Sequence, residues 1–321
     1  MSEARFEHRP VLLDVVVDLF APVPPGIVVD ATVGGAGHAE AIVEAHPHLV
    51  VLGIDQDADA VAAATARLAR FGPRVVVRHA RFDRLEETVS TVSEFAGEEV
   101  TGVLFDLGVS SPQLDRGDRG FSYRHAGPLD MRMDRRRSLT ADDLVNRAER
   151  AELARILRHH GDERFAERIA AAVVAHRPVA TTAELADIVR DAIPAAARRR
   201  GGHPAKRTFQ ALRIAVNEEL AILPDALDQA VDVLAPGGRC VVLAYHSGED
   251  RIVKARFRHH ATGGWRGPVE LPPPPDQRPI VRLLRSGALK PTAEEVGANP
   301  RAASARLRAV EKLPVDTGAA S

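Results

Sequence analysis

Short apolar runs alternate with amphipathic stretches over the first third of this 321-residue chain. The apolar runs predict four strands, at residues 27–31, 50–55, 75–79 and 101–107. The amphipathic stretches predict helices at residues 12–20, 39–45 and 58–71. This alternation is typical of parallel strands joined by crossover helices, and therefore of an α/β fold. Because ligands of such sheets bind outside the carboxyl ends of the strands, the loops after these strands are the first places to look for chemistry.

After Ser111 the pattern changes, and about a hundred residues follow with amphipathic helices and no convincing strand. We predict helices at residues 142–157, 163–176 and 183–192. Thr181, with Glu184 three positions later, forms a capping box for the last of them. These helices indicate an inserted all-helical domain at residues 111–207, within a sheet domain made of residues 1–110 and 208–321.

The sheet pattern resumes in the last third of the chain. Residues 208–234 predict a long helix broken near Pro224, followed by a glycine turn, a strand at 239–245 and a helix at 250–260. The proline-rich residues 268–279 indicate an extended surface linker. Residues 280–284 and 305–311 then predict a closing antiparallel pair of strands.

A glycine-rich turn follows the first predicted strand, at the start of a helix. It contains Gly34, Gly35, Ala36 and Gly37 and is followed by His38. Glycines in such a turn let the backbone approach a ligand closely. Glu40 stands where a dinucleotide fingerprint needs its third glycine, and the Gly-Lys-Ser/Thr ending of a phosphate-binding loop is absent. The turn therefore matches neither a dinucleotide fingerprint nor a phosphate-binding loop.

Acidic residues at the ends of the first two strands indicate what that cofactor is. Asp30 repels phosphate but suits the cationic amino-acid part of S-adenosylmethionine, directly or through water. Asp55 is placed to accept hydrogen bonds from ribose hydroxyls, and Phe82, just past the third strand, to pack on adenine. Taken singly, each is as well explained by a turn, a cap or the core. Together they favour a methyltransferase core over a nicotinamide enzyme.

Composition and charge narrow the class further. The single cysteine, Cys240, excludes an intrachain disulfide and a cysteine-based zinc site. No stretch approaches the roughly 18 apolar residues of a membrane span, so we expect a cytoplasmic protein. Residues 1–110 carry 8 Lys and Arg against 17 Asp and Glu, whereas residues 111–210 carry 20 against 14. A basic middle third fits an RNA-facing module, although arginine-rich helices with solvated faces would give the same balance.

Long segments of the chain closely resemble the bacterial 16S rRNA cytosine-N4 methyltransferases. The resemblance covers nearly the whole chain and is carried by residues 8–13, 105–115, 119–122, 127–134, 203–213 and 245–251. It departs at Gly248, where that family usually has leucine, and at Tyr245, where it often has phenylalanine.

The resemblance implies a class I, Rossmann-like methyltransferase with a mostly parallel seven-stranded sheet, interrupted by a helical RNA-recognition domain. It implies S-adenosyl-L-methionine as cofactor and a cytosine in the decoding region of the small subunit as target. It also implies that a set of residues surrounds the cofactor: Ala36, Gly37, His38, Asp55, Phe82, Asp106 and Gln113.

The loop after the fourth strand is the candidate for methyl transfer to an amine. The N4 amine of cytosine is a poor nucleophile, so acceptors must hold its hydrogens and turn its lone pair toward the methyl group. Amino methyltransferases do this with a polar-Pro loop, and Ser110, Ser111 and Pro112 occupy that place. Asp106 is expected to orient the amine or the cofactor, and His246 either accepts a proton or satisfies its own loop.

Several basic residues are candidates for phosphate contact. They are Arg132, Arg198, Arg199, Arg200, Lys206 and Arg207. The paired histidines at 159–160 and 259–260 lack other ligand types nearby, so we expect no metal site.

Two other functions remain open on the sequence alone. A DNA amino methyltransferase shares the cofactor logic but needs a DNA-reading domain, and an RNA-binding assembly factor with a vestigial cofactor fold would not need Asp30, Asp55 or the Ser-Pro loop. The expected partner is 16S ribosomal RNA, within the small subunit, and the oligomeric state stays open, a homodimer included.

Overall fold

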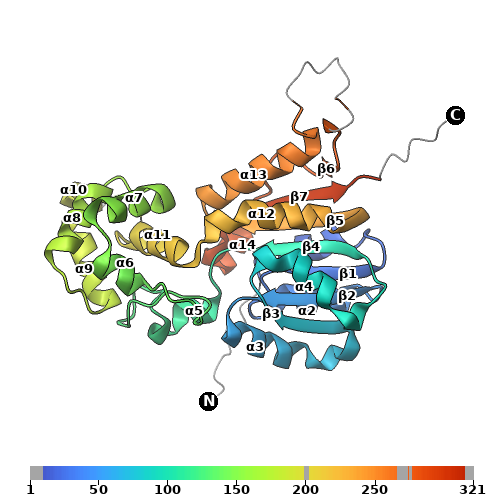
Figure 1. The fold of residues 1–321 in the computed structure, drawn as a ribbon, viewed down its shortest axis with the longest axis horizontal. Coiled ribbons are helices and arrows are strands. Elements are labelled where there is room, and N and C mark those ends of the chain that lie inside the picture. The colour runs from blue at the N-terminus through green and yellow to red at the C-terminus, as the bar shows by residue number, and fades with distance from the viewer. Residues whose placement is uncertain (1–9, 199–201, 266–273, 275–276, 315–321) are drawn as a thin grey trace. The chain divides into compact units, whose positions relative to one another are not determined.

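The computed structural model describes residues 10–198, 202–265, 274 and 277–314. The chain divides into two compact units, which we call the sheet unit (Met1–Gly108 and Ile222–Ser321) and the helical unit (Val109–Ala221). In Figure 1 the sheet unit is blue at its start and orange to red at its end, and the helical unit is green to yellow.

The sheet unit contains a seven-stranded sheet of order β3-β2-β1-β4-β5-β7-β6 (Figure 1). The strands from β3 to β5 are parallel to their neighbours, and β7 runs antiparallel to both β5 and β6. Their bounds are β1 (Gly26–Asp30), β2 (Leu49–Asp55), β3 (Val75–His79), β4 (Val100–Asp106), β5 (Leu234–Ala244), β6 (Val281–Leu283) and β7 (Arg306–Lys312). All seven predicted strands are confirmed, and the largest difference is that β5 begins at Leu234 instead of residue 239.

Helices cover both faces of this sheet. They are α1 (Leu13–Phe20), α2 (Gly37–Ala45), α3 (Ala58–Leu68), α4 (Leu85–Thr91), α12 (Glu219–Asp232), α13 (Ser247–Thr262) and the short α14 (Ala293–Ala298). Alternate residues of β1 point to opposite faces: Val28 packs with α1, α2 and α3, whereas Ile27 and Val29 pack with α4, α12 and α13. Both faces of the parallel strands are therefore buried, which explains why they read as continuous apolar runs.

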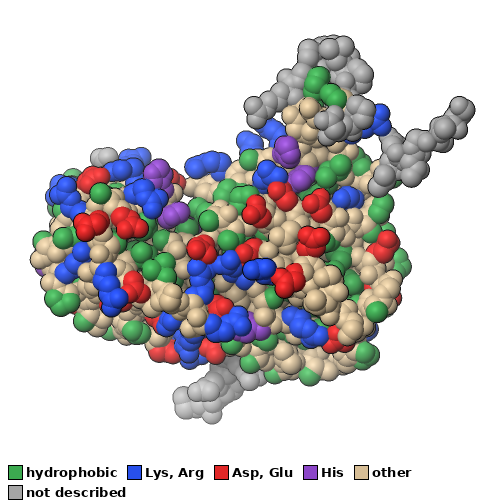
Figure 2. Space-filling model, viewed as in Figure 1, with side chains coloured by type: hydrophobic (Ala, Val, Ile, Leu, Met, Phe, Trp, Pro, Cys, Tyr) green, Lys and Arg blue, Asp and Glu red, His purple; other side chains and the backbone are tan. Residues whose placement is uncertain are grey.

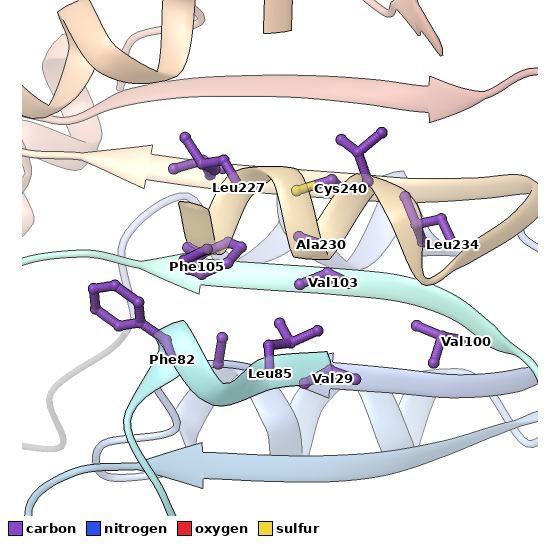
Figure 3. Close-up of a cluster of buried hydrophobic side chains, with 14 of the residues drawn as sticks. Val29, Phe82, Leu85, Val100, Val103, Phe105, Leu227, Ala230, Leu234 and Cys240 are labelled. Atoms are coloured by element: carbon purple, nitrogen blue, oxygen red, sulfur yellow. The ribbon is translucent and has the colours of Figure 1, made fainter. Parts of the chain in front are cut away.

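The core on the α4, α12 and α13 side runs along the strands, from Val100 and Leu234 at the starts of β4 and β5 to Phe105 near the end of β4 (Figure 3). Phe105 of β4 and Cys240 of β5 pack beneath Leu227 and Ala230 of α12, and all four are buried. Phe82 joins them, with its ring edge-to-face with Phe105 at a centroid distance of 5.9 Å. This packing gives the loops that follow the strands a rigid base.

The helical unit contains no strand among its described residues. Its elements are α5 (Ser111–Asp115), α6 (Ala141–Arg147), α7 (Arg150–Gly161), α8 (Ala166–Ala175), α9 (Thr182–Ala192), α10 (Ala195–Arg198) and α11 (Lys206–Asn217). They enclose a core of their own, in which Leu153, Ile169, Leu185 and Phe209 are buried. Thr181 caps α9, since its side chain accepts a hydrogen bond from the Glu184 N–H at 3.2 Å. The reciprocal bond of the predicted capping box is wrong, because Glu184 Oε2 accepts from the Ala180 N–H at 2.8 Å.

Two predicted helices were wrong in detail. The helix expected at 142–157 is two helices, because Ala148 and Glu149 have extended backbone between α6 and α7. The helix expected at 208–234 breaks at Glu218, which is left-handed (φ 57°), while Pro224 lies inside α12. Pro224 removes only one backbone donor from α12, whereas the left-handed backbone of Glu218 cannot continue a right-handed helix. Glu218 therefore ends α11.

The end of the helical unit also differs from the prediction. We expected the insertion to end at residue 207, but the helical unit extends to Ala221. The reason is that α11 packs against α7: Gly161 lies so close to it that an added Cβ would be 2.6 Å from the Arg207 carbonyl oxygen. Burial against α7, which no local pattern reveals, assigns α11 to the helical unit.

Within the described part of the chain, no helix has the length and apolar character needed to cross a membrane.

Candidate active site

Four polar side chains meet where neighbouring strands of the sheet unit end. Asp30 ends β1, Asp55 ends β2 and Asp106 ends β4, while Tyr245 directly follows β5. The strand order places β2, β1, β4 and β5 side by side, so these residues share one edge of the sheet. Sequence reasoning named the three aspartates, and the parallel register of the strands brings them together.

The turn between β1 and α2 has the backbone that its glycines predict. Gly34 is left-handed (φ 48°), and so is Ala36 (φ 62°). A Cβ on Gly37 would lie 2.4 Å from Pro10 Cγ, so only glycine fits there, whereas at Gly35 it would meet nothing within 4 Å. The Gly35 position is thus open for a close approach to the backbone.

Asp55 ties this turn to β2. Its Oδ2 accepts a hydrogen bond from the Gly34 N–H at 2.9 Å, and its Oδ1 accepts one from the Asp57 N–H at 2.9 Å. Burial raises the pKa of Asp55 to about 6, although these two N–H groups oppose the rise. A carboxylate offers about four acceptor positions, and the Gln56 N–H also stabilises this one, so Asp55 keeps an acceptor position for a ligand.

Asp30 is the most buried acid of the group, with 1% of its surface exposed. Its Oδ1 accepts a hydrogen bond from the Thr32 N–H at 3.2 Å. Burial raises the pKa of Asp30 to about 7, while the charge of His38 acts to lower it. A cationic group brought close to this carboxyl would stabilise its ionised form.

His38, in the first turn of α2, bridges the N-terminal segment and the strand ends. Its Nε2 lies 3.0 Å from the Val11 carbonyl oxygen and its Nδ1 lies 3.4 Å from Asp106 Oδ2. Both ring nitrogens face acceptors, and only the imidazolium can donate from both. Burial lowers the pKa of His38, but its bond to Asp106 and the charges of Asp106 and Asp30 outweigh burial and raise it.

Tyr245 completes the cluster from β5, and sequence reasoning did not name it as a site residue. Its hydroxyl donates a hydrogen bond of 2.6 Å to Asp106 Oδ1. Burial and the neighbouring Asp106 carboxylate raise the pKa of Tyr245 well above its usual range. The sequence signal that could have identified Tyr245 is that a tyrosine stands where the resembled family often has phenylalanine.

His246 holds the start of α13. Its Nδ1 accepts from the N–H groups of Gly248 (3.1 Å) and Glu249 (3.4 Å), while Glu249 Oε2 accepts from the His246 N–H at 3.1 Å. The second ring nitrogen lies 3.1 Å from Glu249 Oε1. With Nδ1 used as a helix cap, the loop-satisfying alternative for His246 fits the structure better than proton acceptance. Gly248, where the resembled family usually has leucine, lies in the first turn of α13.

Phe82 follows β3 and is largely buried. Only 8% of the residue is exposed, and its ring is packed in the core against Phe105. This burial fits a core residue, and the packing of Phe82 on adenine stays a prediction.

The Ser-Pro loop begins the helical unit. The Ser110 N–H donates to Gln113 Oε1 at 3.0 Å, and Pro112 lies in the first turn of α5, where it costs no helical hydrogen bond. Gln113 is buried, with 6% exposed. Ser111 starts α5, and its side chain lies outside the described part of the structure.

Among the predicted RNA contacts, Arg132 is already engaged within its own loop. Its guanidinium pairs with both oxygens of Asp130 (2.8 and 2.9 Å) and donates to the carbonyls of Arg135 (3.1 Å) and Arg137 (2.7 Å). These bonds fit a role in holding the loop, since a phosphate would have to displace them, and phosphate contact by Arg132 stays a prediction. Arg198 likewise donates to the Ile193 carbonyl at 2.7 Å.

The remaining basic candidates are less constrained. Lys206 and Arg207 are exposed at the start of α11, and Arg207 donates to the Asp162 carbonyl at 3.0 Å. Arg199 and Arg200 lie outside the described residues. On the visible face of the helical unit, Lys and Arg side chains are mixed with Asp and Glu (Figure 2).

Over the described residues, no group of three or more His, Cys, Asp or Glu side chains is arranged to hold a metal ion.

The sheet order and the site together define the class of the protein. A Rossmann-like order extended by an antiparallel seventh strand, a glycine turn after β1 and an acidic residue ending β2 are the features of a class I methyltransferase.

The chain belongs to the MraW methylase family, which its residues 5–313 match. It is 51% identical over 324 residues to ribosomal RNA small subunit methyltransferase H of Salinispora tropica, covering 98% of this chain and 86% of that protein. It is 53% identical over 312 residues to the protein of the same name from Thermobifida fusca, covering 95% and 93%. The crystal structure of an rRNA methylase from Streptococcus thermophilus matches with a TM-score of 0.41 and 13% identity over 94% of this chain and 95% of that one, too distant a likeness to carry an argument.

Proposed function

We propose that this methyltransferase transfers a methyl group from S-adenosylmethionine to the N4 amine of a cytosine in the decoding region of 16S ribosomal RNA, in the cytoplasm. The observation that carries the proposal is the edge lined by Asp30, Asp55 and Asp106 around an open glycine turn. Three carboxylates repel a pyrophosphate and suit a cofactor that carries a cation and a ribose. The relatives are named as methyltransferases of small-subunit ribosomal RNA, and these names support the choice of substrate.

The residues present fit this cofactor. S-adenosylmethionine, when bound, supplies an electrophilic methyl group on a sulfonium ion. The Asp55 carboxylate at the end of β2 suits the ribose hydroxyls, and the buried Asp30 suits the ammonium group, directly or through water. The open Gly35 position lets the backbone approach the ligand.

The amine must be oriented by groups of this chain. The amine lone pair is delocalised into the cytosine ring, so acceptors have to take both of its hydrogens and turn the lone pair out of the ring plane. We assign this to oxygens of the Ser110–Pro112 loop, which Pro112 and the Ser110–Gln113 hydrogen bond stiffen. Asp106, four residues earlier in the chain, orients the amine or the cofactor, and Tyr245 and His38 fix its two oxygens. Little general-base strength is needed, because the amine proton becomes acidic only after attack.

The test uses purified protein, methyl-labelled S-adenosylmethionine and small subunits from cells that lack the gene. We expect label in one cytosine of the decoding region, located by mass mapping of RNA fragments. Free 16S RNA and an unmethylated DNA duplex serve as parallel substrates. Label in the DNA alone would replace the proposal with a DNA amino methyltransferase. Tight RNA binding without label or cofactor binding would indicate an assembly factor.

A further inference from the structure

Two rings from distant parts of the helical unit stack on each other. The imidazole of His203 lies parallel to the ring of Tyr123, with centroids 4.2 Å apart and planes at 13°. Tyr123 is in turn edge-to-face with the buried Phe209, at 5.7 Å. Phe209 belongs to the core, so the stack stands on a rigid base.

The outer ring of this stack is open to solvent. Tyr123 is half-buried and His203 is exposed. Since one face of the imidazole is covered by Tyr123, its exposed surface is the opposite face and the edge. His203 Nδ1 accepts a hydrogen bond from the Ala205 N–H at 3.2 Å, which restrains the ring. Burial and the charges of Arg124 and Arg190 lower the pKa of His203, which favours a neutral imidazole.

Uncommitted cations flank the stack. Arg124, the residue after Tyr123, and Lys206, whose backbone N–H donates to the His203 carbonyl at 3.0 Å, are both exposed. Neither side chain makes a hydrogen bond or ion pair with another described residue, whereas Arg190 is paired with Asp187 and Asp191. Arg124 is close enough for its charge to act on His203, and Lys206 follows His203 by three residues, so two cations near the stack are available for phosphate.

We infer that Tyr123 and His203 form a stacking site for one unpaired nucleobase of an RNA strand, with Arg124 and Lys206 on the phosphates beside it. A flat, neutral, solvent-facing ring next to free cations fits a base with its own phosphate, because every base has a π-face and single strands present theirs. A paired duplex hides its bases, and an acidic peptide needs no ring. The inference rests on the proposed RNA substrate and adds a site that the cofactor-binding edge does not contain.

The experiment measures binding of the full chain to a short fluorescein-labelled single-stranded RNA by fluorescence anisotropy. Loss of one stacked base should weaken binding about 5- to 150-fold, so we expect that change in His203→Ala. His203→Phe should bind like the wild type, because a planar ring remains. The matched control is His176→Ala, which removes another exposed histidine of the helical unit and should change nothing.

A cycle of RNA and protein changes separates stacking from folding. An RNA with one abasic nucleotide, placed at successive positions, should lose affinity at one position for the wild type and at none for His203→Ala. Lys206→Ala should weaken all sequences alike and reduce the salt slope by about one. Melting temperature and S-adenosylmethionine affinity should stay at wild-type values in every variant.

Two results would overturn the inference while leaving the proposed function intact. One is a wild type that binds and methylates RNA with His203→Ala binding equally well. The other is His203→Phe being as weak as His203→Ala, which would make the imidazole, and not a stacked ring, responsible. A wild type that neither binds nor methylates RNA would instead sink the proposed function and the inference with it.

Discussion

The hydroxyl of Tyr245 and the carboxylate of Asp106 are joined by a hydrogen bond of 2.6 Å across the ends of β5 and β4. Asp106 Oδ2 lies 3.4 Å from His38 Nδ1, so the carboxylate is held from two sides. Tyr245→Phe keeps the ring but frees Oδ1. Because charged hydrogen bonds contribute about 1.5–3 kcal/mol, we expect kcat to fall about tenfold, with the KM for S-adenosylmethionine changed less. An unaltered kcat would mean that His38 and the backbone alone orient Asp106.

The state of this tyrosine can be observed directly, since the chain has only two tyrosines. In Tyr123→Phe, Tyr245 is the sole tyrosine. Because burial and Asp106 raise the pKa of Tyr245, this variant should show no tyrosinate absorbance until alkali unfolds it. Tyrosinate absorbance in the folded variant would place the Tyr245 hydroxyl in solvent, against the structure.

Cofactor affinity should depend on pH through Asp30. The pKa of Asp30 is raised from 3.8 to about 7 in the folded protein. Between these two pH values the folded state holds a proton that the unfolded state has lost, so the contribution of Asp30 to stability falls as the pH rises from 3.8 to about 7. A cationic ligand needs the ionised carboxylate, so affinity should rise about tenfold between about pH 6 and 8. Calorimetry of wild type and Asp30→Asn checks this. The variant should bind weakly at both pH values, and a wild-type pH dependence in it would assign the titration to another group.

Asp55→Ala should abolish measurable cofactor binding. It removes the acceptor for two ribose hydroxyls, at about 1.5–3 kcal/mol each, and leaves the Gly34 N–H without its partner. A weakening of at least about a hundredfold follows, measured by calorimetry. Glu94→Ala is the control, because Glu94 is an exposed acid of the sheet unit paired with Arg78. An unchanged dissociation constant in Asp55→Ala would refute the placement of the ribose.

Ser111→Ala combined with Pro112→Ala should separate turnover from cofactor binding. The double variant loosens the loop that we assign to the amine, and a displacement of about 1 Å costs up to about a hundredfold in rate. We expect kcat to fall about ten- to a hundredfold, with the dissociation constant of S-adenosylmethionine unchanged. Ser90→Ala, an exposed serine of α4, should leave both unchanged. If turnover survives in the double variant, the amine is oriented elsewhere.

The helical unit depends on one buried amide. Asn217 is fully buried, accepts from the Met133 N–H at 2.8 Å and donates to the carbonyls of Met131 (2.8 Å) and Arg213 (2.9 Å). Asn217→Ala removes the amide bonds to the backbone of Met131 and Met133, so we expect a loss of about 3 kcal/mol in the free energy of unfolding. Urea unfolding measures it. Gln210→Ala, which loses one 3.4 Å bond to His160, should cost less than about 1 kcal/mol, and an equal cost in both would contradict the assignment.

Local patterns in the sequence determined the elements of the sheet unit and the outline of its site. Apolar runs and their periodicity located all seven strands, most clearly β1, β2 and β4, which are buried on both faces. The glycine turn and the aspartates ending β1, β2 and β4 could be found because strand ends are marked by where the apolar run stops. The Thr181 cap was equally local, since its partner lies three residues away.

Tertiary structure alone decided which of these residues act together. His38, Asp106 and Tyr245 are far apart in the chain and meet only through the strand order. Likewise, Phe82 is a core residue because Phe105 packs on it, and Arg132 is occupied because its loop folds around it. Periodicity and propensity report each residue's immediate neighbours, whereas burial and hydrogen-bond partners depend on segments brought together by packing, which carry no mark of one another in the sequence.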